Sequence, residues 1–202
     1  MRIRRVTVLV LILTIILIGY ASAEDALPRG KSFSITKTEW LNRYAAVPIM
    51  FAVYETAIYP VKLTEEDYRV YYIATPYKDV NVVLMCEDTT DYVVGVSIML
   101  DLSVLDDDYE SGVKIGKFIN EFIRRSAFAT DPNISIDWIT NDLFTIIDLA
   151  AISENRDVDN VLDKDGIRFN FSFSDGSLFY GLRNVNTFSS EEEFLRYRDS
   201  TL

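Results

Sequence analysis

The sequence predicts an α+β fold, built on a mainly antiparallel sheet of about five strands with helices packed on one face. Helical and strand-like segments come in separate runs, in the order α-β-β-β-α-α-β-β-α, and such segregation is typical of α+β proteins. Short turns join the strand-like segments, and short turns connect antiparallel neighbours. We expect a single domain over residues 36–202, with two subdomains divided near residue 106 as the alternative.

Residues 1–23 have the composition of a secretory signal peptide. Three arginines precede an almost purely apolar run, Val6–Gly19, and Ala21-Ser22-Ala23 supplies the small residues that a signal peptidase requires. We expect cleavage after Ala23, which makes the mature protein secreted or periplasmic, and the arginine-rich start suits a bacterial protein. A retained membrane anchor is the alternative, although the apolar run is shorter than the ~20 residues of a spanning helix. Residues 24–35 are expected to be a leader to the domain.

The first helix is predicted by a capping box at residues 36–39, where a Thr hydroxyl and a Glu side chain cap each other's amides. Trp40 and Tyr44 follow at helical spacing. Pro48 interrupts or kinks this helix, because proline lacks a backbone donor. Residues 49–58 fit either a second helical piece or a buried strand.

Three strands are predicted next, from segments rich in Val, Ile and Tyr: Tyr68–Thr75, Val80–Glu87 and Tyr92–Leu102. The turns between them are expected at residues 76–79 and 88–91. Because these turns are short, the three strands should form an antiparallel meander.

Two helices and a hairpin complete the prediction. Apolar residues at helical spacing indicate helices from about 105 to 127 and from about 136 to 152, and the acidic residues 153–165 are expected to form a loop. Alternating apolar residues around an Asp-Gly pair predict a hairpin over Ile167–Leu182, because glycine accepts the positive φ of a tight turn. A capping box at residues 190–193 predicts a short terminal helix.

Charge and composition exclude several classes of function. The chain has 20 basic and 31 acidic residues, a net charge of −11, and removal of residues 1–23 takes away three arginines and lowers it to −14. Such a surface repels nucleic acid and anionic lipid, so we expect neither nucleic-acid binding nor membrane insertion of the mature chain. The absence of histidine removes Ser-His-Asp and Cys-His catalysis and His-ligated zinc.

The candidate site residues each have a structural interpretation that we favour. Cys86, the single cysteine, lies in an apolar run and should be a buried core residue. Asp157–Gly166 resembles a calcium loop only in its centre, because Val161 and Ser172 occupy the first and twelfth ligand positions. The acidic groups Asp106–Asp108 and Glu110 suit a hydrated helix start.

Four tyrosines also gather around one predicted strand and its turn, and they could serve recognition or simply pack in a sheet: Tyr68, Tyr71, Tyr72 and Tyr77.

These observations predict an exported domain, without a cofactor, metal site or catalytic residue, that binds a protein or a component of the cell envelope. A proteinaceous enzyme inhibitor belongs to the same binding class. The competing hypothesis is an extracellular hydrolase that uses paired carboxylates, for example on glycans. The sequence identifies neither the partner nor the oligomeric state.

Overall fold

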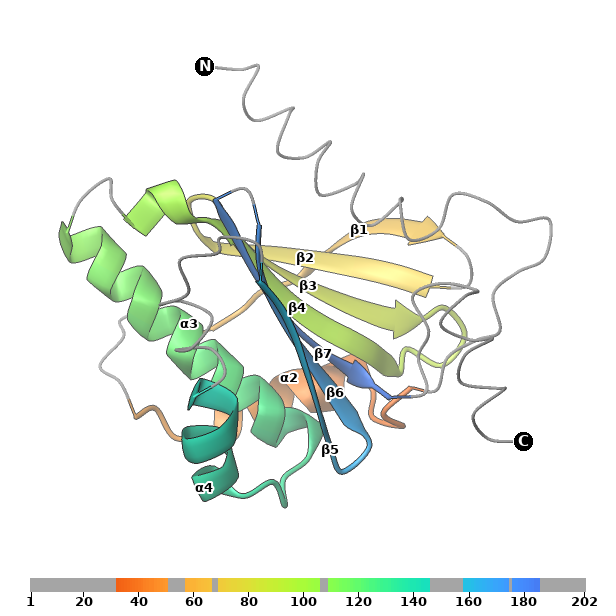
Figure 1. Ribbon diagram of the computed structural model, residues 1–202. Helices are drawn as coiled ribbons and strands as arrows, with labels where there is room; N and C mark the ends of the chain where they lie inside the picture. The colour runs from red at the N-terminus through yellow and green to blue at the C-terminus, as the bar shows by residue number, and fades with distance from the viewer. Residues whose placement is uncertain are drawn as a thin grey trace. The chain divides into compact units, whose positions relative to one another are not determined.

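The computed structural model describes residues 32–50, 57–66, 69–105, 109–145, 158–174 and 176–185, which belong to one compact unit, Lys31–Val185 (Figure 1). The helical segments are α2 (Lys37–Ala46), η1 (Leu102–Leu105), α3 (Tyr109–Thr130), α4 (Ile136–Trp138) and η2 (Ile139–Leu143), the last of these a π-helical turn that continues α4. The strands are β1 (Val61–Glu66), β2 (Arg69–Tyr77), β3 (Val80–Glu87), β4 (Val93–Asp101), β5 (Val158–Lys164), β6 (Ile167–Ser174) and β7 (Ser177–Asn184).

The seven strands form one sheet in the order β1-β2-β3-β4-β7-β6-β5, and every neighbouring pair is antiparallel. The α+β class is therefore confirmed, whereas the expected number of about five strands is wrong. Strand β4 pairs with β7, so residues from both sides of position 106 lie in one sheet.

The two additional strands, β1 and β5, are the edges of this sheet. Strand β5 replaces the loop expected over 153–165; residues 153–157 lie outside the described residues. Its polar sequence has no apolar alternation because an edge strand buries less side-chain surface than a central one. The turn after it, Asp165-Gly166, has φ of +50° and +81°, the positive values that an Asp-Gly hairpin turn requires.

Several local signals in the sequence are confirmed, although the Glu39 carboxylate pairs with Arg43 at 2.6 Å and does not complete the predicted capping box. Helix α2 begins after Thr36, whose hydroxyl accepts a hydrogen bond from the Glu39 amide at 3.2 Å, and it ends before Pro48. Strand β3 has the predicted bounds, and the β6–β7 turn includes Gly176 with φ of +77°. The second predicted helix begins at Ile136 and turns π-helical after three residues.

Five expectations fall wholly or partly outside the described residues: the signal peptide, most of the leader, residues 51–56 of the helical piece or strand expected over 49–58, the end of the second helix after 145, and the terminal helix.

The helices α2, α3 and α4 pack on one face of the sheet (Figure 1). Phe122 of α3 contacts Tyr180 of β7, with ring centroids 6.3 Å apart, and it also contacts Tyr44 of α2 at 6.0 Å. Trp138 of α4 contacts Phe169 of β6 at 5.1 Å. This aromatic layer joins all three helices to the strands, and it forms the centre of the core.

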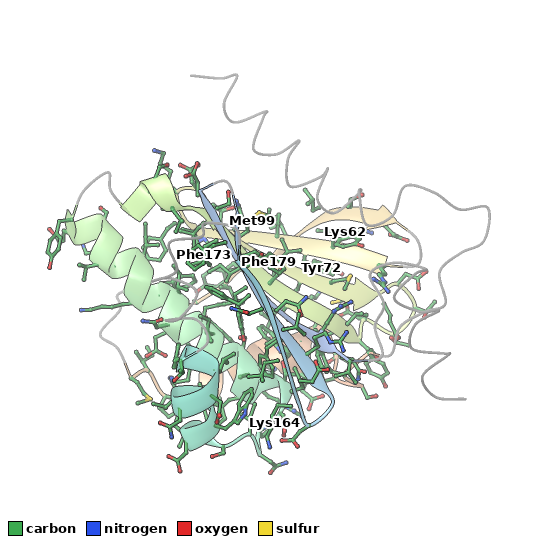
Figure 2. The ribbon with its side chains drawn as sticks, viewed as in Figure 1. Lys62, Tyr72, Met99, Lys164, Phe173 and Phe179 are labelled. Atoms are coloured by element: carbon green, nitrogen blue, oxygen red, sulfur yellow. The ribbon has the colours of Figure 1, made fainter. Side chains whose placement is uncertain are left out.

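On the opposite face of the sheet, an aromatic ring covers one glycine of β7. A Cβ atom added to Gly181 would lie 2.8 Å from the ring of Phe179, so that ring lies across the backbone of its own strand. Figure 2 labels Phe179 and Met99, which are register partners across β7 and β4.

We expect the substitution Gly166→Ala to destabilise the protein by about 1 kcal/mol, because alanine is strained at a positive φ. The matched substitution Gly116→Ala lies inside α3, where an added Cβ meets no atom within 4 Å, and it should stabilise by up to ~1 kcal/mol. Urea unfolding of both variants measures the difference. Equal effects of the two substitutions would contradict the assigned turn.

Candidate binding surface

Helix α3 buries charged side chains, a costly arrangement unless each charge is paired. Glu121 is 0% exposed, and Arg124 and Arg125 are also buried. The three residues lie in the C-terminal half of the helix, next to Phe122 and Ile123 of the core. Their partners therefore decide whether this half of the helix is stable.

The buried charges bind each other and the chain that follows α2. The Nη2 of Arg124 donates to Oε2 of Glu121 at 2.7 Å and also to the carbonyl of Pro48. Oε1 of Glu121 accepts from the amide of Met50 at 2.5 Å. One acidic and one basic side chain thus hold residues 48 to 50 against α3.

Arg125 binds the end of α2 itself. Its Nε and Nη2 donate to the carbonyl of Tyr44, at 3.0 and 2.6 Å, and its guanidinium lies 4.3 Å from the centre of the Tyr44 ring. The last carbonyls of a helix have no partner inside it and attract cations. We call Glu121, Arg124 and Arg125, with these backbone partners, the buried charge cluster.

The backbone that the buried charge cluster holds presents apolar side chains to solvent. Ile49 is 51% exposed and Met50 is 63% exposed. On α3 itself, Tyr109 and Val113 are also exposed, and they precede Glu121 by three and two steps of four residues. Tyr109 and Val113 are four residues apart, so these two side chains lie on the same side of α3.

We call the exposed residues Ile49, Met50, Tyr109 and Val113 the outer surface of α3. It includes four of the eight large apolar residues that are exposed in the described part of the chain. Exposed apolar side chains are candidate contacts for a partner where several of them gather. A backbone already fixed in place also loses little conformational entropy when a partner binds.

A small hollow lies near the start of α3, but it does not offer an enclosed site. Its volume is about 210 Å³, below the ~300–1,000 Å³ of typical ligand pockets. It is lined by Tyr77, Lys78, Val104, Ser111, Lys114 and Ile115. Both lysines form ion pairs, Lys114 with Glu110 at 2.7 Å and Lys78 with Asp79 at 3.6 Å.

Cys86 lies in the core, on β3, as the sequence predicts. Burial raises the pKa of its thiol to about 12, with a smaller contribution from Asp91. The thiol is therefore neutral at physiological pH, and a neutral thiol is a poor nucleophile.

Two acidic residues of the segment that partly resembles a calcium loop pair with basic side chains in the structure. Asp163 accepts two hydrogen bonds from Arg168, each of 2.9 Å, and Asp165 forms an ion pair with Lys164 in the turn. Within the described residues, no three metal-ligating side chains lie close enough to hold a metal. Asp157 and Asp106–Asp108 lie outside those residues.

The tyrosines of the predicted cluster do not share a surface. Tyr71 is buried on β2, while the next residue, Tyr72, faces the other side of the sheet and stacks under the Lys37 ammonium at 3.5 Å. Tyr77 packs edge-on against Phe118 of α3, at 5.3 Å. The three described tyrosines are structural, and Tyr68 lies outside the described residues.

The buried charge cluster was not predicted from the sequence. A helical projection places Glu121 and Arg125 at the border of the apolar face of α3, where charged residues are ordinarily solvated. The signal that could have drawn attention to them is three charges between Phe118 and Ala127 in the most apolar part of the helix. The partners, residues 44 to 50, are too distant in sequence to be inferred.

Comparisons with protein-family models, curated proteins and solved structures found no match to this chain. In the part of the chain that the structure describes, no helix is long and apolar enough to cross a membrane.

We expect Glu121→Gln to destabilise the protein by about 3 kcal/mol, because it leaves the buried Arg124 without its counter-ion. The control is Glu110→Gln, which removes an exposed ion pair on the same helix and should change stability by less than ~0.5 kcal/mol. Chemical denaturation of the two variants provides the comparison. A small effect of Glu121→Gln would show that the buried charge cluster is not required for folding.

We expect the Cys86 thiol to resist modification in the folded protein, since its raised pKa keeps it protonated at pH 8 and the side chain is buried. A thiol reagent such as dithionitrobenzoate should react at pH 8 only after unfolding in guanidinium. Stoichiometric reaction within seconds under native conditions would contradict this placement.

Proposed function

We propose that the protein is an exported domain that binds a protein or a component of the cell envelope, without catalysing a reaction. The observation that carries this proposal is the exposure of Ile49 and Met50 on a backbone that buried charges hold in place. Burying these charges has a desolvation cost, and a solvent-exposed loop would not have that cost. A fixed apolar surface is useful to a binding partner, which is why we assign the function to it.

The remaining parts of the proposal come from the sequence. The segment 1–23 supports export, and the net charge of −14 after its removal disfavours nucleic acid as the partner. An acidic surface around a small apolar site also keeps an exported protein soluble until it meets its partner. A proteinaceous inhibitor of an extracellular enzyme would use the same kind of surface.

No contact of the described residues favours the alternative of a carboxylate-dependent hydrolase. Glycosidases need two carboxyl groups facing each other across a cleft, with different environments. Many of the described carboxylates are instead paired with a neighbouring cation, as Asp163 is with Arg168 and Glu39 with Arg43. The buried carboxylate of Glu121 accepts hydrogen bonds from Arg124 and from the Met50 amide.

We expect the double substitution Ile49→Ser/Met50→Ser to weaken binding of the partner by tenfold or more. Truncating central apolar contacts of an interface typically costs this much binding free energy, roughly 1.4 kcal/mol or more. The protein, produced with its own leader and purified after export, is immobilised and exposed to the solubilised envelope of its own cells. Mass spectrometry identifies and quantifies the species retained.

The control is Val161→Ser on the edge strand β5, where the valine is similarly exposed at 52%. It should leave binding unchanged. Both variants should keep the unfolding midpoint of the parent, since the substituted side chains are exposed. Retention of the same species by the parent and the double variant would refute the proposal, and an N-terminus other than Glu24 would refute the predicted cleavage.

A further inference from the structure

We propose that Met50 is a site of reversible oxidation, and that conversion of its thioether to the sulfoxide weakens binding of the partner. The site follows from the exposure and the surroundings of the sulfur atoms in the described residues. Its effect on binding rests on the function proposed above, because Met50 belongs to the surface to which that function is assigned.

The sulfur atoms of the chain differ in their access to solvent. The chain has four methionines and one cysteine, and Met1 belongs to the predicted signal peptide. Of the three methionines in the described residues, Met50 is 63% exposed, whereas Met85 and Met99 are partly buried on strands β3 and β4. Oxidation by a dissolved reagent favours accessible side chains. Met50 is therefore the described methionine that such a reagent reaches most easily.

Two of the other sulfur atoms are also protected chemically. The sulfur of Met85 accepts a hydrogen bond from Nη1 of Arg69 at 3.3 Å, and the Arg69 side chain is itself buried. A thioether is oxidised by donating a lone pair of its sulfur, so a lone pair that binds a cation is less available. Cys86 is buried and its thiol stays protonated at physiological pH, so it does not compete as a thiolate.

The reaction needs a two-electron oxidant, and a peroxide such as hydrogen peroxide supplies the oxygen. A lone pair of the Met50 sulfur attacks one peroxide oxygen, so that an S–O bond forms and the O–O bond breaks. The second oxygen leaves as water, and the two electrons lost by sulfur are gained by the peroxide. A methionine sulfoxide reductase reverses the step at the expense of two thiols, which become a disulfide, and releases water.

The fold holds Met50 by its backbone, which oxidation does not alter. The Met50 amide donates to Oε1 of Glu121 at 2.5 Å, and the nearby Pro48 carbonyl accepts a hydrogen bond from Arg124. The sulfoxide is polar where the thioether is apolar, so a partner that covers this side chain must desolvate the S–O group. Oxidation should therefore weaken binding and leave the protein folded.

The first test measures the oxidation rate of each methionine. The protein, produced with its own leader and purified after export, is treated with hydrogen peroxide and digested, and mass spectrometry follows the addition of one oxygen atom to each methionine peptide. We expect Met50 to react roughly tenfold faster than Met85 and Met99, and the three rates to become similar in guanidinium. Similar rates in the folded protein, or faster reaction at Met85 or Met99, would overturn the assigned site.

The second test measures retention of the partner. The immobilised protein is oxidised, freed of peroxide and then exposed to the solubilised envelope, so the partner itself is not oxidised. Retention should fall several-fold and return after treatment with methionine sulfoxide reductases and dithiothreitol. The unfolding midpoint of the oxidised protein should match that of the parent.

Two leucine variants assign the effect to one sulfur atom. In Met50→Leu, retention should be the same before and after peroxide, because this variant has no sulfur at position 50. Met99→Leu should keep the peroxide sensitivity of the parent. Leucine and methionine have similar volumes, so both variants should fold. A loss of retention on oxidation that persists in Met50→Leu would refute the control of binding by this residue.

The two tests separate this inference from the proposed function. If Ile49→Ser/Met50→Ser abolishes retention but oxidation does not lower it, the control of binding is refuted and the proposed function survives. If the double substitution has no effect, the proposed function fails and the control of binding fails with it. The oxidation rates, which need no partner, decide in either case whether Met50 is the modified site.

Discussion

The structure depends on the pairing of three charges that helix α3 buries. Glu121 and Arg124 neutralise each other and also bind backbone groups of residues 48 to 50, while Arg125 binds the end of α2. Apolar contacts alone would let the chain after α2 slide over α3, because dispersion has no preferred direction. Hydrogen bonds from buried charges have defined partners and geometry, so this cluster fixes where α2 ends and where the exposed Ile49 and Met50 are placed.

The aromatic layer beneath the cluster has a complementary role. Trp40 stacks on Tyr44 at 5.4 Å, and Tyr44 contacts Phe122, which contacts Tyr180 of the sheet. Tyr44 thus belongs to both the aromatic layer and the buried charge cluster, because its ring lies against the Arg125 guanidinium and its carbonyl accepts hydrogen bonds from Arg125. Tyr44 therefore couples the packing of the core to the placement of the exposed Ile49 and Met50.

The sequence predicts the elements whose causes are local and misses those whose causes are distant. Thr36 caps α2 within one turn, and Gly176 lies in the turn between β6 and β7 with a positive φ, so both features could be predicted. Asp165-Gly166 is an equally strong turn signal, but the polar edge strand β5 lacks apolar alternation, so its sequence predicts a loop. The outer surface of α3 could not be predicted, because the burial of Glu121 depends on Met50, a residue far away in the chain.

The junction between β4 and β7 has a consequence for how the protein assembles. Gly95 pairs with Arg183 and Asp101 with Ser177, so the centre of the sheet closes between segments separated by both α3 and α4. Pairings so distant in the chain form slowly, after the local hairpins. As the chain is synthesised, the β1–β4 meander emerges first, and the edge of β4 has no strand partner until β7 has followed. An unpaired strand edge is prone to aggregation, so this interval is the vulnerable stage of folding.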